Sequence, residues 1–328
     1  ASATTEPKPV SEPDEKVQDA SPDASTGNEP YGVAQVVTPN GLEIYFQAGP
    51  KRLYRLRTTF WGHSPEGDDP EAPWIEVPSM SDVKDILDKA GLPWWGQGVG
   101  VRGTLTLAAE GLVDLAYVDP MTIDGMVDLI HGNKQKGIKG LLSQNKLTVN
   151  HTLDKAADRG TNVHKTLETW AETGTMPIPD VYPAHERGYV KGVVDFLLHS
   201  GAEPVAQEVM VGSLEWGFAG RFDLIAQIPD GAEVFVHRTE KGRGDRKEKI
   251  PGGRWLLDLK TSADVYESHM LQCAGYELAY RECYGEETDF QGVIQVPADG
   301  RYKLVKSRAT IEHFQYLKFT YDSLKEIG

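Results

Sequence analysis

Apolar and polar positions alternate along several short stretches of the chain, whereas elsewhere the apolar positions recur every three or four residues. Alternation is clearest in residues 33–37, 42–46 and 53–56, where turn residues separate runs of β-branched and aromatic side chains. The helical spacing is clearest in residues 147–173, where apolar and small side chains share one face. We therefore expect a small N-terminal β-meander and, further along the chain, a long amphipathic helix.

The rest of the pattern predicts a mixture of helices and strands. From residue 147 onward we expect helices at 147–173 and 183–200, strands at 204–212, 217–228, 232–238 and 253–260, a helix at 264–284, a strand at 290–297 and a C-terminal helix at 309–326. Before residue 147 we expect a capped helix from Ser79, a break at residues 93–96, and helical segments near 103–116 and 121–131. This order predicts an α/β (α+β) fold in which helices flank a central mixed sheet.

Composition divides the chain into three parts. Residues 1–30 are rich in Pro, Ser, Asp, Glu and Thr and nearly free of large apolar side chains. Such a segment cannot bury enough surface to offset its ordering entropy, so we expect a disordered acidic tail. Residues 31–146 hold the β-meander and a helical region, and residues 147–328 hold the main domain with a basic insertion at residues 229–252.

The net charge of −15 is concentrated in two segments. Residues 1–30 carry seven acids and two bases, and residues 66–76 carry five acids and no base. Residues 238–254 instead carry seven bases and three acids, a net charge of +4, which suits contact with phosphate groups. The candidate nucleic-acid-binding side chains of this segment are Arg243, Arg246, Lys247 and Lys249. A solvated basic hairpin is the alternative.

Cysteine content and hydropathy restrict the compartment. The two cysteines, Cys273 and Cys283, are too few for a disulfide framework. No apolar stretch is long enough to span a bilayer. Together these features predict a cytoplasmic protein with no membrane partner.

An Asp-x-Lys pair is the strongest chemical signal in the chain. Asp258 and Lys260 lie two residues apart in an apolar run, so on a strand both side chains point to one face while Leu257 and Leu259 point into a core. Asp223 lies in a second strand-like run upstream. Two carboxylates and an ammonium group on one sheet face suit a hard cation, a water and a phosphate, with the backbone carbonyl of Leu259 as a further candidate ligand. An isolated Asp-x-Lys is more often a solvated ion pair, so the neighbouring motifs decide the interpretation.

Those neighbouring motifs occur in a particular order. They are Gly160-x-x-x-His164, Glu208, Gly220-x-x-Asp223, Asp258-x-Lys260 and Gln272-x-x-x-Tyr276. The order resembles the RecB-like branch of the PD-(D/E)xK nuclease superfamily, which includes CRISPR-associated and bacteriophage exonucleases. The resemblance covers about residues 150–285 and implies a restriction-endonuclease-like core.

The resemblance also implies a metal centre. Within it, His164, Asp223 and Asp258 would bind Mg²⁺, with Mn²⁺ able to substitute, and Glu208 would help to hold metal or water. Without the resemblance, His164 would be a helix-face histidine packed on the sheet, and Glu208 a partly exposed acid on an edge strand.

Lys260, Gln272 and Tyr276 would complete this centre. Lys260 would either orient the attacking water, as a base if its pKa were depressed, or stabilise charge on the phosphate; a structural ion pair with Asp258 is the alternative. Gln272 and Tyr276 lie four residues apart on one helix face and would contact the lysine, the phosphate or the DNA backbone. Helix packing explains the same spacing.

The cysteines depart from the pattern of many relatives, which hold a 4Fe–4S cluster through four cysteines. This chain has two, so we expect no iron–sulfur cluster.

The resemblance implies a Mg²⁺-dependent DNA exonuclease, phage-encoded and serving recombination, repair or replication in the host cytoplasm. DNA is the expected partner, and a recombination or single-strand-binding protein is a further candidate. A structure-specific endonuclease on the same scaffold and a non-catalytic nucleic-acid-binding subunit are the alternatives. RNA stays open as a substrate.

Overall fold

A computed structural model provides the three-dimensional description. It describes residues 32–49, 52–58, 74–87, 92–113, 126–129, 133–237, 246–262 and 264–327. The tail expected at residues 1–30, most of the acidic segment 66–76 and Arg243 lie outside these residues.

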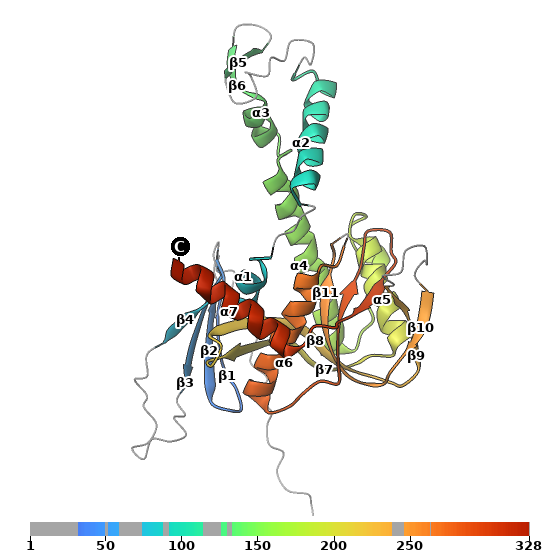
Figure 1. Cartoon of the computed structure of the whole chain (residues 1–328). Coiled ribbons are helices and arrows are strands. Elements are labelled where there is room, and N and C mark those ends of the chain that lie inside the picture. The colour runs from blue at the N-terminus through green and yellow to red at the C-terminus, as the bar shows by residue number, and fades with distance from the viewer. Residues whose placement is uncertain are drawn as a thin grey trace, which may run out of the picture.

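A seven-stranded mixed sheet forms the centre of the protein (Figure 1). Its strands are β7 (Glu203–Ser213), β8 (Phe218–Ile228), β9 (Ala232–Val236), β10 (Arg246–Ile250), β11 (Gly253–Lys260), β12 (Phe290–Gln295) and β13 (Lys303–Lys306). Their spatial order is β10-β9-β13-β12-β11-β8-β7. The β11–β12 and β13–β9 pairs run parallel and the other pairs antiparallel, so β11 lies between an antiparallel and a parallel neighbour.

Helices cover both faces of this sheet. On one face, α4 (Val149–Thr173) and α5 (Arg187–Ser200) share a buried cluster with Trp255, Leu257 and Leu259 of β11. On the other face, α6 (Glu267–Tyr284) and α7 (Ile311–Ile327) share a second cluster that includes the intervening Leu256. The alternation predicted for β11 is therefore confirmed, and it leaves Asp258 at the polar end of this second face.

A four-stranded antiparallel sheet packs against that second cluster. Its strands are β1 (Val33–Val37), β2 (Leu42–Gln47), β3 (Leu53–Thr58) and β4 (Ile75–Val77), in this order. The side chains of Leu42, Ile44 and Leu56 are buried together with Met210 and Phe218 of the central sheet. The predicted β-meander is confirmed, and its inner face belongs to the same core as β7 and β8.

The segment between the two sheets begins with α1 (Met80–Lys84), whose buried Met80 and Val83 belong to the second cluster. The rest of the segment forms an arm that holds α2 (Leu92–Ala109), β5 (Met126–Leu129), β6 (Asn133–Lys136) and α3 (Ile138–Gln144). A reciprocal capping box between Ser79 and Asp82 starts α1, as the sequence predicts. Figure 1 shows α2, α3, the β5–β6 pair and the first turns of α4 projecting from the body.

Two expectations for the arm are wrong. The break expected at residues 93–96 falls inside α2, because Pro93 occupies the first turn of the helix, where its missing N–H costs no hydrogen bond. The helix expected near residues 121–131 is replaced over part of its length by β5, which pairs with β6. Short apolar runs do not distinguish helix from strand by periodicity alone.

The expected fold class is confirmed: helices flank a central mixed sheet, and an antiparallel β-meander precedes it. Strands β4, β10 and β13 and helix α3 were not predicted. Among the described residues, no helix combines the length and the apolar character that crossing a bilayer requires.

Candidate metal centre

The centre lies where β8 and β11 separate. The two strands pair from Gly253 opposite Ile228 to Leu257 opposite Leu224, and the ladder ends there. The next N–H that β11 directs towards β8 belongs to Leu259, and it donates to the Asp223 carboxylate at 2.6 Å instead of to a backbone carbonyl. Where the ladder ends, the Asp223 side chain on β8 is therefore held by a backbone N–H of β11.

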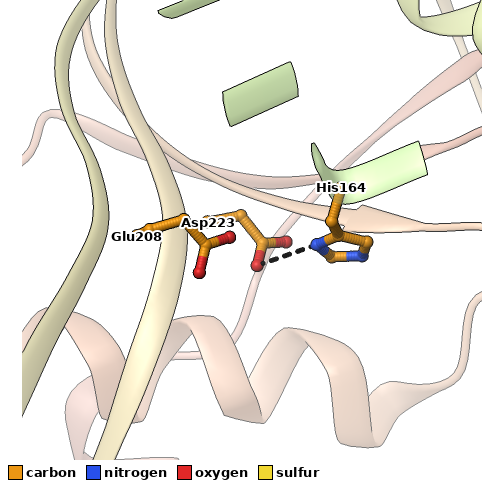
Figure 2. Close-up of side chains that lie close together, drawn as sticks. All are labelled: His164, Glu208 and Asp223. Atoms are coloured by element: carbon orange, nitrogen blue, oxygen red, sulfur yellow. Dashed lines mark ion pairs between the residues drawn. The ribbon is translucent and has the colours of Figure 1, made fainter. Parts of the chain in front are cut away.

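His164 reaches Asp223 from helix α4. Its Nδ1 atom lies 3.2 Å from the second carboxylate oxygen of Asp223 (Figure 2). The buried side chains of Val163 and Leu167 anchor this part of α4 on the sheet. Asp223 therefore has a partner on each oxygen, one from the helix and one from the neighbouring strand.

Glu208 completes a cluster of three candidate ligands. It lies on β7 between Gln207 and Val209, which pair with Leu224 and Phe222, so its position is opposite Asp223. Ligand atoms of His164, Glu208 and Asp223 all lie within 4.8 Å of one another, and Figure 2 shows the three side chains converging.

The backbone of Glu208 is strained. Its φ of +47° is in the left-handed region, which a residue with a Cβ atom adopts at a cost of about 1–2 kcal/mol. This left-handed conformation occurs in the middle of a strand, at a residue whose side chain is part of the cluster.

Asp258 and Lys260 form a second polar group beside the cluster. The carboxylate of Asp258 is 2% exposed, and its Oδ2 atom lies 2.6 Å from the Lys260 ammonium. Asp258 is not one of the three converging ligands; its side chain is instead engaged by the lysine. Burial lowers the pKa of Lys260, but the charges of Asp258 and Asp223 outweigh this and raise the pKa above its ordinary value.

The acids in this region have shifted pKa values. Burial and the nearby Asp223 charge raise the pKa of Glu208 to about 7. Burial raises the pKa of Asp258, although Lys260 opposes the shift. Burial would also raise the pKa of Asp223, but the charge and hydrogen bond of His164 reverse the direction and lower it. The pKa of His164 rises correspondingly, since Asp223 overcomes the effect of burial.

Gln272 and Tyr276 lie on α6, the helix that packs on the sheet face carrying Asp258. The Gln272 amide donates to the Tyr276 hydroxyl at 2.9 Å, and both side chains are buried. Burial and the Asp258 charge raise the pKa of Tyr276 well above its ordinary value, so the phenol keeps its proton.

The tyrosine also explains Gly220. A Cβ atom at this position would lie 2.7 Å from the Tyr276 ring, so the close approach of α6 to β8 requires glycine. Gly160 has no such requirement: a Cβ atom there would lie 3.6 Å from the Thr261 hydroxyl, an ordinary contact. A glycine within a helix predicts the close approach of another backbone or of a phosphate; no backbone of another described element comes within 4 Å of this Cβ position, and contact with a phosphate stays a prediction.

The three converging ligands fit a hard cation. Two neighbouring ligands of an octahedral ion, each at about 2.1 Å, lie about 3.0 Å apart, close to the 3.2 Å that separates His164 from Asp223. Two carboxylates and one imidazole suit Mg²⁺ or Mn²⁺. The Lys260 carbonyl accepts from the N–H of Val296, just after β12, so the Leu259 carbonyl faces the opposite edge, towards Asp223. This orientation is compatible with its role as a backbone ligand.

The basic segment lies away from this centre. Arg246, Lys247 and Lys249 lie on β10, at the opposite edge of the sheet from β7. Four strand spacings separate β10 from β11, roughly 19 Å. Contact of these side chains with nucleic acid stays a prediction, and it would take place far from the cluster.

The two cysteines lie on α6 and are both buried. Cys273 contacts the carbonyl of Gly292, and the Cys283 thiol donates to the carbonyl of Gly212 at 3.2 Å. Burial raises the pKa of the Cys273 thiol well above its ordinary value and that of the Cys283 thiol to about 11. Both thiols therefore keep their protons at neutral pH, and a protonated thiol is a poor metal ligand.

Sequence reasoning missed one charged neighbour of the cluster. Arg221 lies 3.6 Å from Glu208, and its guanidinium lies over the ring of Phe46 in the N-terminal sheet. Its position two residues before Asp223 in the same motif was the available signal.

Comparisons with known proteins do not identify a family for this chain. Its sequence matches no protein-family model, and a search of curated proteins finds no match.

Proposed function

We propose that the protein is a metal-dependent nuclease of the RecB-like type that hydrolyses phosphodiester bonds in DNA from a strand end. The observation that carries the proposal is the convergence of His164, Glu208 and Asp223 beside the Asp258–Lys260 pair. Helix α4 and strands β7, β8 and β11 contribute these side chains, so the arrangement depends on the whole fold.

The energetic argument favours a bound cation. Buried acids that face one another disfavour folding unless a positive charge compensates them. Glu208 has its pKa raised to about 7 and a strained backbone, two costs that a purely structural role does not explain. A non-catalytic subunit would have no need of this arrangement.

Each residue has a chemical task in the proposed reaction. His164, Glu208 and Asp223 would hold the cation, with Asp258 and the Leu259 carbonyl as further ligands if Lys260 releases the aspartate. A bound Mg²⁺ would supply an activated water and neutralise charge on the phosphate. Lys260 would stabilise negative charge as the phosphate is attacked, since its raised pKa keeps it protonated in the metal-free protein. Tyr276 would hold its hydroxyl proton as a hydrogen-bond donor.

Cleavage assays on labelled linear and covalently closed circular DNA test this proposal. An exonuclease degrades the linear DNA in the presence of Mg²⁺ or Mn²⁺, spares the closed circle, and stops after chelation. Cleavage of both substrates would indicate an endonuclease. DNA binding without cleavage would indicate a non-catalytic subunit, and degradation of RNA at the same rate would widen the substrate class.

The Lys260→Ala variant separates binding from catalysis. It should lose turnover by at least about 100-fold while Mn²⁺ still binds, because the lysine is not a ligand. Near-wild-type turnover would contradict the assigned role. A cytoplasmic location, a phage origin and a role in recombination, repair or replication belong to the same proposal.

A further inference from the structure

Arg221 has unused hydrogen-bonding capacity beside the metal centre. Its Nη1 atom lies 3.6 Å from Glu208 Oε2, which is longer than a direct hydrogen bond of about 2.7–3.2 Å. The structure shows no hydrogen bond from this guanidinium to any residue that it describes, and the side chain is 35% exposed. A guanidinium has five N–H donors in a planar fork, so this side chain can still bind an acceptor such as a phosphate.

The N-terminal sheet holds this guanidinium in position. The Cζ atom of Arg221 lies 5.3 Å from the centre of the Phe46 ring on β2. The Phe46 ring in turn packs against Tyr54 on β3, with 4.8 Å between ring centres, and Tyr54 is buried. An arginine stacked on an anchored ring loses little further freedom when it binds a planar or tetrahedral anion.

We propose that Arg221 forms a phosphate-binding position next to the metal centre, in which the N-terminal sheet helps to bind the nucleic-acid strand by holding the guanidinium in place. The inference rests on the proposed nuclease function and adds one residue and the N-terminal sheet to its substrate site. The bound group is a phosphate of the strand next to the bond that is cut, either a 5′-terminal phosphate or an internal diester.

The electrostatics favour an anion at this position once the centre is loaded. Glu208 partly balances Arg221 in the metal-free protein. When Glu208 shares its charge with a cation, the arginine faces a region of net positive charge, and the phosphate oxygens become its best partners. Arginine binds phosphate through two parallel N–H bonds, a geometry that lysine cannot reproduce.

The test compares Arg221→Gln and Arg221→Lys with a matched control, Arg254→Gln. Arg254 is exposed to a similar degree and is also ion-paired, with Glu286, but it lies at the opposite end of β11 from the centre. Binding of a fluorescent single-stranded oligonucleotide is measured in Ca²⁺, and steady-state cleavage in Mg²⁺. Isothermal titration with Mn²⁺, in the absence of DNA, reports whether the metal centre is intact.

The proposal predicts a tenfold or larger rise in KM for both Arg221 variants with a smaller change in kcat. In Arg221→Gln, the magnitude of the slope of log affinity against log salt concentration should fall by about 0.7, the value for one lost contact on a single strand, whereas Arg221→Lys keeps the charge and should retain most of the slope. Mn²⁺ affinity should change less than threefold, and Arg254→Gln should behave as the wild type in both DNA measurements.

Substrate ends distinguish the two sources of phosphate. If the bound group is a 5′-terminal phosphate, wild type prefers 5′-phosphorylated over 5′-hydroxyl oligonucleotides, and the Arg221 variants lose that preference. If it is an internal diester, both oligonucleotides lose affinity equally.

Unchanged oligonucleotide affinity in Arg221→Gln would overturn the inference. So would a loss of Mn²⁺ affinity as large as the rise in KM, because Arg221 would then act only through Glu208. Failure of the nuclease proposal looks different: wild type would bind the oligonucleotide without cutting it, and the effect of Arg221 on binding would still be measurable. A wild type that binds no oligonucleotide would exclude both.

Discussion

Glu277 on α6 and Glu208 on β7 are both acids held within the body of the protein, but the groups that reach them differ. Glu277 is fully buried, and its two oxygens accept hydrogen bonds from Arg281 at 2.6 Å, from the Thr288 backbone at 3.1 Å and from the Thr288 hydroxyl at 2.5 Å. Glu208 has Arg221 at 3.6 Å and another carboxylate, Asp223, opposite it on the next strand.

The difference teaches what burial of an acid means. Around Glu277, each oxygen has donors, so the charge is compensated within the chain and the acid joins α6 to the loop that follows it. Glu208 is only partly buried, with 26% of its side chain exposed, yet the compensation is incomplete, the pKa is raised to about 7 and the backbone is strained. A partly buried acid indicates a ligand site when it lacks the hydrogen bonds that Glu277 has and faces a second acid.

The largest expected effect is a loss of cleavage, and it should separate two aspartates that each accept a backbone N–H of β11. Asp223 accepts the N–H of Leu259 near the end of β11, and Asp289 accepts the N–H of Arg254 at its beginning, at 2.8 Å. Asp223→Asn should reduce cleavage by at least about 1,000-fold, some 4 kcal/mol in activation free energy, because a neutral amide is a poor ligand for a hard cation. Asp289→Asn should leave single-turnover rates within about threefold of wild type. Equal losses in both variants would show that the aspartate serves the strand and not a metal.

The next largest effect is a loss of folding stability at Glu277, the acid with a structural role. Glu277→Ala should lower the free energy of unfolding by about 3 kcal/mol, since it leaves the buried donors of Thr288 without an acceptor. Urea denaturation measures the loss, and Mn²⁺ affinity at 25 °C should remain that of the wild type. Loss of Mn²⁺ binding in this variant would place Glu277 in the same functional class as Glu208.

Much of the fold follows from local patterns in the sequence. The alternation of β11 and the glycine-terminated helices α4 and α6 are strong local signals, and both are present in the structure. Strands β10 and β13 were missed because they are short and carry charged residues, so no alternation extends far enough to identify them. Their pairing depends on the sheet edge that other strands provide.

The sequence gives candidate residues for the site more readily than their geometry. His164, Asp223, Asp258 and Lys260 were proposed from spacing and resemblance, and their roles stay predictions. The left-handed backbone of Glu208 contradicts the intrinsic preference of glutamate, so no local rule predicts that it turns towards Asp223. The contact between Arg221 and Phe46 depends on docking of the N-terminal sheet onto β8, a long-range feature that periodicity does not report.

The pH dependence of stability provides an intermediate effect. Glu208 has its pKa raised from an ordinary 4.5 to about 7, so the folded state binds this proton more tightly than the unfolded state. Metal-free protein should therefore lose stability as pH rises from about 4.5 to 7. The raised pKa values of His164 and Asp258 act in the same direction, whereas the lowered pKa of Asp223 acts only at lower pH.

A bound cation should reverse this trend. It requires deprotonated ligands, so stabilisation by Mn²⁺ should grow with pH and reach about 2.7 kcal/mol at a free concentration 100-fold above Kd. Thermal unfolding with and without Mn²⁺ between pH 5 and 8 measures both trends. Glu208→Gln should flatten the metal-free curve, whereas a curve identical to that of the wild type would remove Glu208 from the cluster.

The smallest effect separates backbone strain from charge repulsion at Glu208. Lys146 also has a positive φ, +56°, but it lies in the arm just after α3 and belongs to no cluster of candidate metal ligands among the described residues. Replacing either residue by glycine relieves the left-handed strain and adds freedom to the unfolded chain, two terms of about 1 kcal/mol that nearly cancel. At pH 8, Glu208→Gly should additionally remove the repulsion with Asp223 and stabilise the metal-free protein by about 1 kcal/mol more than Lys146→Gly. At pH 5, where Glu208 is protonated, this excess should vanish. An excess that persists at pH 5 would assign the cost at Glu208 to its backbone alone, and the contrast with Glu277 would then be one of conformation and not of charge.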